Sequence, residues 1–147
     1  MTFNFNSKNI LITGGTGQIG SFLVESLIKY DCYITVLGRN SKNMKEIKSF
    51  VEGKRIRFIE CDITEEKSVK AASSLISQTD YLVHLSSELS SAFTTPFEDA
   101  KNSIDINLNG TIRLLESFEK LEGILYSSTI AVYGKPNYLP VNEMHPT

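Results

Sequence analysis

The sequence predicts an α/β fold in which a parallel sheet is covered by helices on both faces. Three observations carry this prediction: five short apolar runs, helical patterns between them, and a glycine-rich string directly after the first run. Each parallel strand is reached by a crossover over one face of the sheet, so strands that alternate with helices indicate a doubly wound sheet. A chain of 147 residues fits one such domain.

The expected strands are short runs of apolar and β-branched residues. Such runs are typical of parallel strands that are buried on both faces. They lie at 9–13, 33–37, 55–60, 81–85 and 123–128.

Helices are expected where apolar residues recur at spacings of three and four. The first covers 21–30, the second follows a cap at Asn40 or Ser41, and the third follows a cap at Asp62 or Thr64. A fourth, longer helical stretch is a possible homodimer surface, and its apolar positions are Ile104, Leu108, Ile112, Leu115 and Phe118.

The composition argues against several classes of function. A net charge of −2 and a pI near 5.7 provide no basic surface for nucleic acid or anionic lipid. No apolar run approaches the ~18 residues of a membrane span and no signal peptide is visible, so we expect a cytoplasmic protein. Cys32 and Cys61 lie in or beside expected strands without metal-ligand spacing, which predicts reduced core thiols and no metal site.

The glycine-rich string Thr13-Gly14-Gly15-Thr16-Gly17-Gln18-Ile19-Gly20 lies between the first strand and the first helix. In this context glycines allow a tight turn, a close approach of the main chain to a pyrophosphate, and close helix packing at Gly20. The start of the helix adds free N–H groups and the positive end of a dipole. A dinucleotide site is therefore predicted, with contacts from Gly14, Thr16, Gly17, Gln18, Ile19 and Gly20.

Five motifs together resemble the extended short-chain dehydrogenase/reductase family, in particular its epimerase/dehydratase members. They are TGGTGQIG at 13–20, CDI at 61–63, VHLSS at 83–87, NLNGT at 107–111 and SSTIAVYG at 127–134. The resemblance implies a Rossmann-type sheet of order 3-2-1-4-5 that lacks the C-terminal part of the family fold. It divides the chain into an NAD(P)-binding domain at 1–128 and an active-site loop at 129–147.

The resemblance also implies roles for individual residues. Asp62 would bind the adenine amino group, the backbone of Ile63 would support the base, and Thr129 would supply a catalytic hydroxyl to the substrate oxygen. His84 is expected to be a satisfied core histidine. The remaining cofactor contacts implied are Leu85, Ser86, Ser87, Asn107 and Ser127.

The general acid/base of such enzymes is a Tyr followed four positions later by a Lys. Here Tyr133 is followed at that spacing by Asn137, and Tyr138 by Asn142. We therefore expect the chain to be a truncated part of a longer enzyme that carries the pair and a substrate domain; a naturally short gene is the alternative.

The residues after the second strand bear on the choice of cofactor. An acid at this place would bind the ribose 2′-OH of NAD, but the sequence has Gly38, followed by Arg39 and Asn40. A guanidinium can hold a 2′-phosphate by charge-assisted hydrogen bonds, so NADP is favoured and NAD is the alternative.

The function predicted is hydride transfer between a nicotinamide and a nucleotide-activated sugar, in an epimerase, dehydratase or reductase. The isolated chain is expected to be inactive because the Tyr and Lys are missing. A non-catalytic sensor of nicotinamide dinucleotides, or a partner subunit, is the alternative.

Overall fold

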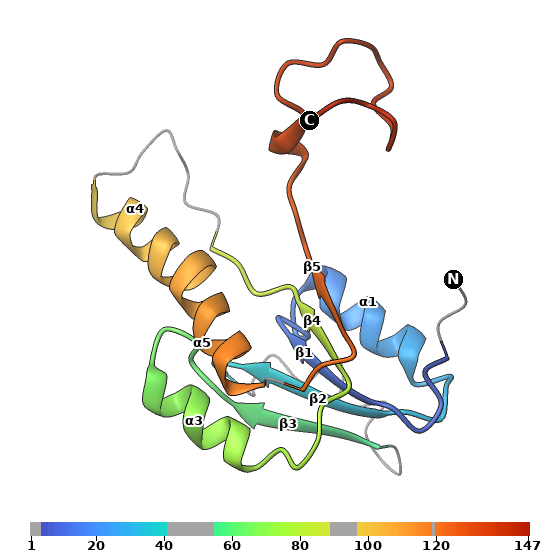
Figure 1. The fold of residues 1–147 in the computed structure, drawn as a ribbon, viewed down its shortest axis with the longest axis vertical. Coiled ribbons are helices and arrows are strands. Elements are labelled where there is room, and N and C mark those ends of the chain that lie inside the picture. Colours follow the sequence, from blue (N-terminus) through green and yellow to red (C-terminus); the bar gives the residue numbers. More distant parts are fainter. Residues whose placement is uncertain (1–3, 41–54, 89–96, 119) are drawn as a thin grey trace.

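Five parallel strands form one sheet in the computed structural model, which describes residues 4–40, 55–88, 97–118 and 120–147. The strands are β1 (Asn9–Thr13), β2 (Tyr33–Gly38), β3 (Ile56–Glu60), β4 (Tyr81–His84) and β5 (Gly123–Tyr126). Their order across the sheet is β3-β2-β1-β4-β5 (Figure 1), so the predicted doubly wound sheet and its strand order are confirmed.

The register brings the carboxyl ends of the central strands to one edge. Thr13, the last residue of β1, pairs with Leu37 on one side and with His84 on the other. The residues that follow β1, β2 and β4 therefore meet at this edge. From β1 the strands are added first on one side (β2, β3) and then on the other (β4, β5), so the switch point lies between β1 and β4. Open α/β sheets bind ligands at such a switch point.

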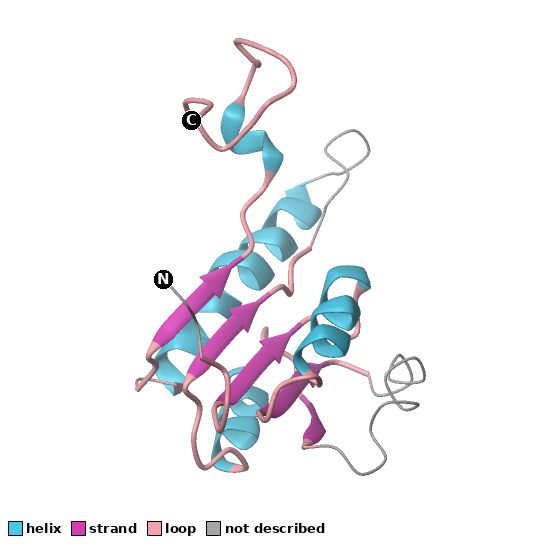
Figure 2. Cartoon of the chain, turned by 90° about the vertical axis from the view of Figure 1, so that its right-hand side faces the viewer, coloured by secondary structure: helices cyan, strands magenta, loops and turns pink. Residues whose placement is uncertain are grey.

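Helices cover both faces of the sheet (Figures 1 and 2). The helix α1 (Gln18–Leu27) packs Val24 and Leu27 onto one face, whereas α3 (Glu66–Ser74) and α5 (Thr111–Ser117) cover the other. Each face has its own apolar core, because side chains of a strand alternate between faces. Among the described residues, no helix combines the length and the apolar character needed to cross a membrane.

Two predicted helix starts are wrong. The helix α1 begins at Gln18, earlier than the predicted 21, and its N-cap Gly17 offers no side chain to cap it. The helix α3 begins after its N-cap Glu65, and neither Asp62 nor Thr64 caps it. Instead, Asp62 Oδ1 accepts hydrogen bonds from the main-chain N (2.9 Å) and the hydroxyl (2.8 Å) of Thr64, which form a local turn before the helix. The helix predicted after Asn40 falls in 41–54, outside the described residues.

The long helical stretch consists of three consecutive parts. The helix α4 (Phe97–Ile104) continues into a π-helical segment, η2 (Asp105–Gly110), and then into α5. Phe118 is buried, but the other four predicted apolar positions are between 38% and 55% exposed. These four residues form what we call the apolar stripe: Ile104, Leu108, Ile112 and Leu115.

The chain after β5 extends away from the sheet (Figure 1). A short 3₁₀ helix, η3 (Ile130–Tyr133), is followed by a hook that closes around the buried His145. His145 Nε2 accepts a hydrogen bond from the main-chain N of Asn137 at 2.9 Å, and the rings of Tyr133 and Tyr138 lie against the imidazole.

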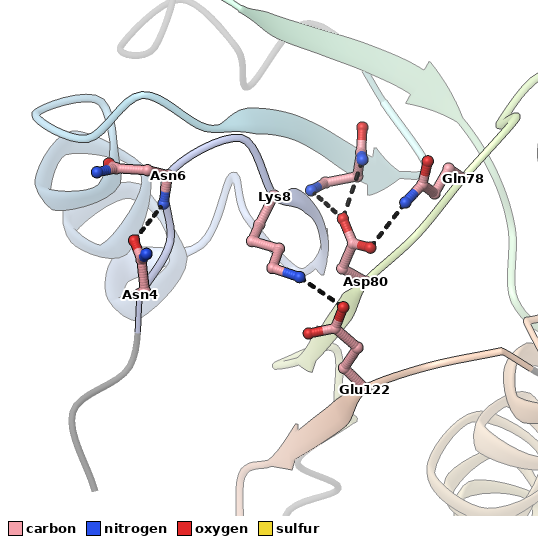
Figure 3. Close-up of polar contacts among 7 residues, drawn as sticks. Asn4, Asn6, Lys8, Gln78, Asp80 and Glu122 are labelled. Carbon is pink, nitrogen blue, oxygen red and sulfur yellow. Dashed lines mark hydrogen bonds and ion pairs between the residues drawn. The ribbon is translucent and has the colours of Figure 1, made fainter.

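Figure 3 shows polar contacts at the amino-terminal edge of the sheet. Asp80 Oδ2 accepts hydrogen bonds from the main-chain N (2.6 Å) and side-chain amide (2.9 Å) of Asn9, and Oδ1 accepts one from Gln78 (2.8 Å). Burial acts to raise the pKa of Asp80, but these bonds outweigh it and hold the pKa below its ordinary value. At the same edge Lys8 pairs with Glu122 at 2.5 Å.

Candidate functional site

A cleft of about 600 Å³ lies at the carboxyl edge of the sheet. It is formed by the glycine loop and by the residues that follow β2, β3 and β4. Its lining comprises Gly14, Thr16, Gly17, Leu37, Gly38, Arg39, Asn40, Cys61, Asp62, Ile63, Thr64, Leu85, Ser86, Ser87, Glu88 and Ile106.

Gly14 occupies a position of the glycine loop that both its backbone conformation and its surroundings reserve for glycine. Its φ of +68° lies in the left-handed region, and an added Cβ would lie 2.8 Å from the carbonyl carbon of Leu85 and 2.9 Å from the N of Ser86. The loop after β4 therefore packs main chain against main chain on the glycine loop.

The start of α1 faces this loop. Gly17 donates a main-chain hydrogen bond to Gly14 O at 2.9 Å, which closes the turn. The N-cap Gly17 has no side chain, so it cannot satisfy the first N–H groups of the helix. Such groups favour an anion, and the arrangement is suited to a pyrophosphate.

The adenine side predicted for the cleft is built on the chain after β3. Asp62 and Ile63 both line the cleft, and Ile63 is buried. Gly110 of η2 packs against Ile63 so closely that a Cβ would lie 2.9 Å from its side chain. Arg113 donates to Ile63 O at 3.3 Å and to Asp105 at 3.0 Å, so η2 and α5 hold this wall of the cleft.

The opposite wall is the loop 85–88, which contains the predicted Leu85, Ser86 and Ser87. Asn107 lies outside the lining, but its amide holds this loop: Oδ1 accepts from Glu88 N at 2.8 Å and Nδ2 donates to Glu88 O at 3.0 Å. The structure thus makes Asn107 a support of the cleft wall.

His84 ends β4 and is only 2% exposed. Its Nδ1 lies 2.5 Å from Thr13 Oγ1 and its Nε2 lies 2.9 Å from Thr111 Oγ1. Burial lowers the pKa of the imidazole, which favours the neutral form. The prediction of a satisfied core histidine is confirmed.

Gly38 and Arg39 lie at the end of β2 and line the cleft, as does Asn40. A Cβ on Gly38 would lie 3.2 Å from the ring of Phe58, so a side chain fits there only if this ring moves. Arg39 is the basic residue of this part of the cleft.

Several predicted site residues lie outside the lining of the cleft: Gln18, Ile19, Gly20, Asn107, Ser127 and Thr129. Ser127 follows β5 and donates its main-chain N–H to His84 O at 3.2 Å. Thr129 is exposed and caps η3, where its hydroxyl accepts a hydrogen bond from Ala131 N at 3.3 Å.

Five residues that line the cleft were not predicted as site residues: Leu37, Cys61, Thr64, Glu88 and Ile106. Leu37, Cys61 and Thr64 lie near predicted positions, and strand ends are a signal that could have identified them. Glu88 is held beside η2 by its main-chain hydrogen bonds to the Asn107 side chain, and Ile106 precedes Asn107 in that segment. This placement depends on tertiary packing.

The sheet order and the cleft at its switch point define a Rossmann-fold protein. The chain belongs to the family described as GDP-mannose 4,6 dehydratase, which matches residues 11–147. The expected relationship to the extended short-chain dehydrogenases/reductases is thereby confirmed.

Proteins similar to this chain support the same grouping. A UDP-glucose 4-epimerase of Drosophila melanogaster is 31% identical over 151 residues, which cover 94% of this chain and 42% of that protein. The crystal structure of a UDP-Glc/GlcNAc 4-epimerase of Campylobacter jejuni has a TM-score of 0.75 at 29% identity and covers 95% of this chain and 43% of that one.

A short-chain dehydrogenase/reductase of Brucella melitensis shares the fold, with a TM-score of 0.79 at 22% identity over 92% of this chain and 63% of that one. The chain spans about 43% of the length of the first curated relatives that it matches.

Proposed function

We propose that this chain is the NAD(P)-binding portion of an enzyme that modifies a nucleotide-activated sugar by epimerisation, dehydration or reduction. Residues 1–128 form the dinucleotide-binding domain, and 129–147 form the active-site loop and the approach to a catalytic Tyr and Lys. The main support is the close approach of Gly14 to Leu85 and Ser86, which builds a glycine cradle at the switch point of the sheet.

The residues of the cleft fit a nicotinamide dinucleotide. The free amides at the start of α1 face the place of the pyrophosphate, Asp62 offers a carboxylate to the adenine amino group, and the loop 85–88 faces the ribose and nicotinamide. A bound nicotinamide would exchange a hydride with the sugar, transiently in epimerisation or dehydration and with net transfer in reduction. The chain's own groups bind and orient both reactants.

Thr129 is proposed as the catalytic hydroxyl. Its oxygen accepts from Ala131 N, so its own proton remains available for donation to a sugar oxygen. In a form of the protein that contains the Tyr and Lys, Thr129→Val should lower turnover by roughly 10²–10³-fold with little change in cofactor affinity. Thr129→Ser should restore much of the rate, whereas a parallel loss of cofactor affinity would contradict a catalytic role.

The substrate class rests on the family and the relatives. The family is described as a GDP-mannose dehydratase, and the similar proteins are UDP-sugar epimerases. The substrate class common to these names is a nucleoside diphosphate sugar.

NADP is proposed as the cofactor, with NAD as the alternative. The end of β2 carries Gly38 and Arg39 where an NAD-specific site would carry an acid, and both residues line the cleft. The names of the relatives do not bear on this choice, so it rests on Arg39 alone.

A homodimer through the long helical stretch is also proposed. The apolar stripe presents four large side chains at helical spacing on α4, η2 and α5, and each is at least 38% exposed. A second copy of the chain would remove this surface from water.

A second candidate is a non-catalytic dinucleotide-binding sensor or partner subunit. It is favoured by the absence of a Tyr-x-x-x-Lys pair from the 147-residue sequence, in which Tyr133 and Tyr138 are followed at that spacing by Asn137 and Asn142. Reading the encoding gene past codon 147 separates the two candidates: a continuing frame with Tyr-x-x-x-Lys supports the enzyme, and a natural stop supports the module.

Calorimetric titration of the folded 147-residue chain with NADP and NAD tests the binding proposal directly. We expect weak binding, accompanied by thermal stabilisation, and no turnover of nucleotide sugars. Absence of both heat and stabilisation with either dinucleotide would contradict the proposed function.

A further inference from the structure

A chain of polar contacts crosses the core beside the cleft. Ser86 N donates to Thr13 Oγ1 at 3.2 Å, Thr13 Oγ1 contacts His84 Nδ1, and His84 Nε2 contacts Thr111 Oγ1. Thr111 Oγ1 in turn donates to Asn107 O at 2.8 Å. The contacts therefore connect the loop 85–88, β1, β4 and the helical layer.

The donor and the acceptor of each hydrogen bond follow from the two ends of this row of polar contacts. Thr111 donates its hydroxyl proton to Asn107 O, so Thr111 Oγ1 must be the acceptor in its contact with His84. The imidazole must therefore carry its proton on Nε2. His84 Nδ1 is then an acceptor and receives the hydroxyl proton of Thr13. Thr13 Oγ1 remains free to accept from Ser86 N. One neutral tautomer satisfies all four bonds.

We propose that His84, as a neutral imidazole protonated on Nε2, is a positioning residue that fixes the 85–88 wall of the cleft against the glycine loop. This inference rests on the proposed function of the cleft as a dinucleotide site. His84 acts through Thr13 and Thr111 and does not line the cleft.

The packing at the cleft leaves little room for this wall to move. The main chain of Leu85 and Ser86 lies within 3.0 Å of the place that a Cβ on Gly14 would take. The near end of the loop is held by Thr13, which also accepts from Leu85 N through its carbonyl at 3.2 Å. The far end is held by Asn107 through Glu88. If the Thr13 hydroxyl no longer accepted from Ser86 N, the loop 85–88 would shift, and with it the groups that face the dinucleotide.

The tautomer is measured first, by long-range ¹H–¹⁵N correlation spectra of the His84 ring in the ¹⁵N-labelled chain near pH 7. We expect one neutral state with the proton on Nε2. A proton on Nδ1, or a charged ring, would overturn the proposal.

The second measurement compares matched threonine variants. Thr13→Val keeps the side-chain shape and removes the hydroxyl. Thr35→Val does the same on the neighbouring strand, where Thr35 Oγ1 accepts a hydrogen bond from Arg57 Nε at 2.9 Å. We expect Thr13→Val to speed amide exchange of Ser86 and weaken NADP binding about tenfold, the effect of losing one hydrogen bond, with rescue by Thr13→Ser. Thr35→Val should change neither.

Equal effects of Thr13→Val and Thr35→Val on Ser86 exchange and on affinity would overturn the proposal, because both variants lose a buried hydroxyl. Thr111→Val provides a further check, since it should move the His84 proton away from Nε2. A wild-type chain that binds no dinucleotide would overturn the proposed function, whereas the tautomer and the exchange of Ser86 would still decide the role of His84.

Discussion

Gly20 lies so close to Gly14 that a Cβ on Gly20 would be 2.2 Å from the carbonyl oxygen of Gly14. The same Cβ would lie 2.5 Å from the Cα of Gly15, so the first turn of α1 rests directly on the glycine loop. Gly14 in turn supports Leu85 and Ser86. A helix, a turn and a strand end thus meet through main-chain contacts, and each depends on the absence of a side chain.

Gly20→Ala should therefore separate α1 from the glycine loop. Both atoms that the new methyl group meets belong to the main chain and cannot rotate away, so we expect a stability loss of about 1–3 kcal/mol. Dinucleotide affinity should fall about 10–100-fold, because the helix amides move from the pyrophosphate. Urea unfolding and calorimetric titration measure the two effects. Ser21→Ala, which removes only a half-buried hydroxyl that donates to Gln18 O within the same turn, is the control and should bind normally.

Arg39→Gln should weaken NADP binding without comparable loss of NAD binding. Removal of a charge-assisted hydrogen bond costs about 1.5–3 kcal/mol, or roughly 10–100-fold in affinity. The control is Arg55→Gln, which removes the same charge from an exposed arginine that pairs with Asp31 away from the cleft. If the ratio of the two dissociation constants does not change in Arg39→Gln, then Arg39 is not at the ribose and NADP is not preferred for this reason.

Acid should destabilise the protein through Asp80. The folded-state pKa of this carboxyl is below the unfolded value of about 3.9. Its contribution to the free energy of unfolding is therefore fully present above that pH and is lost as the pH falls through the folded-state pKa. Asp80→Asn should cost about 1–3 kcal/mol at neutral pH, because an amide group cannot accept all three bonds. The variant should also lose less stability than the wild type on acidification below pH ~4.

Urea unfolding at a series of pH values measures the effect of Asp80. Glu122→Gln is the control at the same edge, since its pair with Lys8 is exposed and screened by solvent. An unchanged acid response in Asp80→Asn would mean that other carboxyl groups dominate.

Leu108→Asp should convert a dimer into a monomer by placing a charge in the apolar stripe. Sedimentation velocity of the wild-type chain and the variant gives the oligomeric state, and circular dichroism shows whether folding is retained. Leu75→Asp changes another exposed leucine, the C-cap of α3 outside the stripe, and should leave the dimer intact. A wild-type chain that is monomeric at every concentration would rule out this interface in the 147-residue chain.

The sequence predicted the strands and the doubly wound sheet because parallel strands have a strong apolar signal and alternate with helices, whereas the strand order followed from the resemblance to the dehydrogenase/reductase family. The cap predictions failed at Asp62 and Thr64, since these residues bond to each other in a local turn before the helix begins. The π-helical segment also escaped prediction. Its Gly110 packs on Ile63 and its Asn107 holds Glu88, and neither contact is visible from helical periodicity.

The polar chain through His84 was predictable only in part. Thr13 and His84 are both last in adjacent strands, so the order of strands places them side by side. The partner Thr111 depends on how α5 packs on the sheet, which the sequence pattern does not specify. Polar site residues were recognisable where they follow strands, whereas supporting residues on helices required the tertiary structure.

The strand β5 lies at the edge of the sheet and is poorly covered. Ile124, Leu125 and Tyr126 are each more than half exposed, and no described strand pairs with the outer side of β5. Such an edge is a template for intermolecular strand addition, so the isolated chain should be prone to aggregation as its concentration rises. A charged residue at position 125 in place of Leu125 would oppose this intermolecular strand pairing. The apolar surface of β5 is thus a liability for handling the chain in solution, independent of its ligand chemistry.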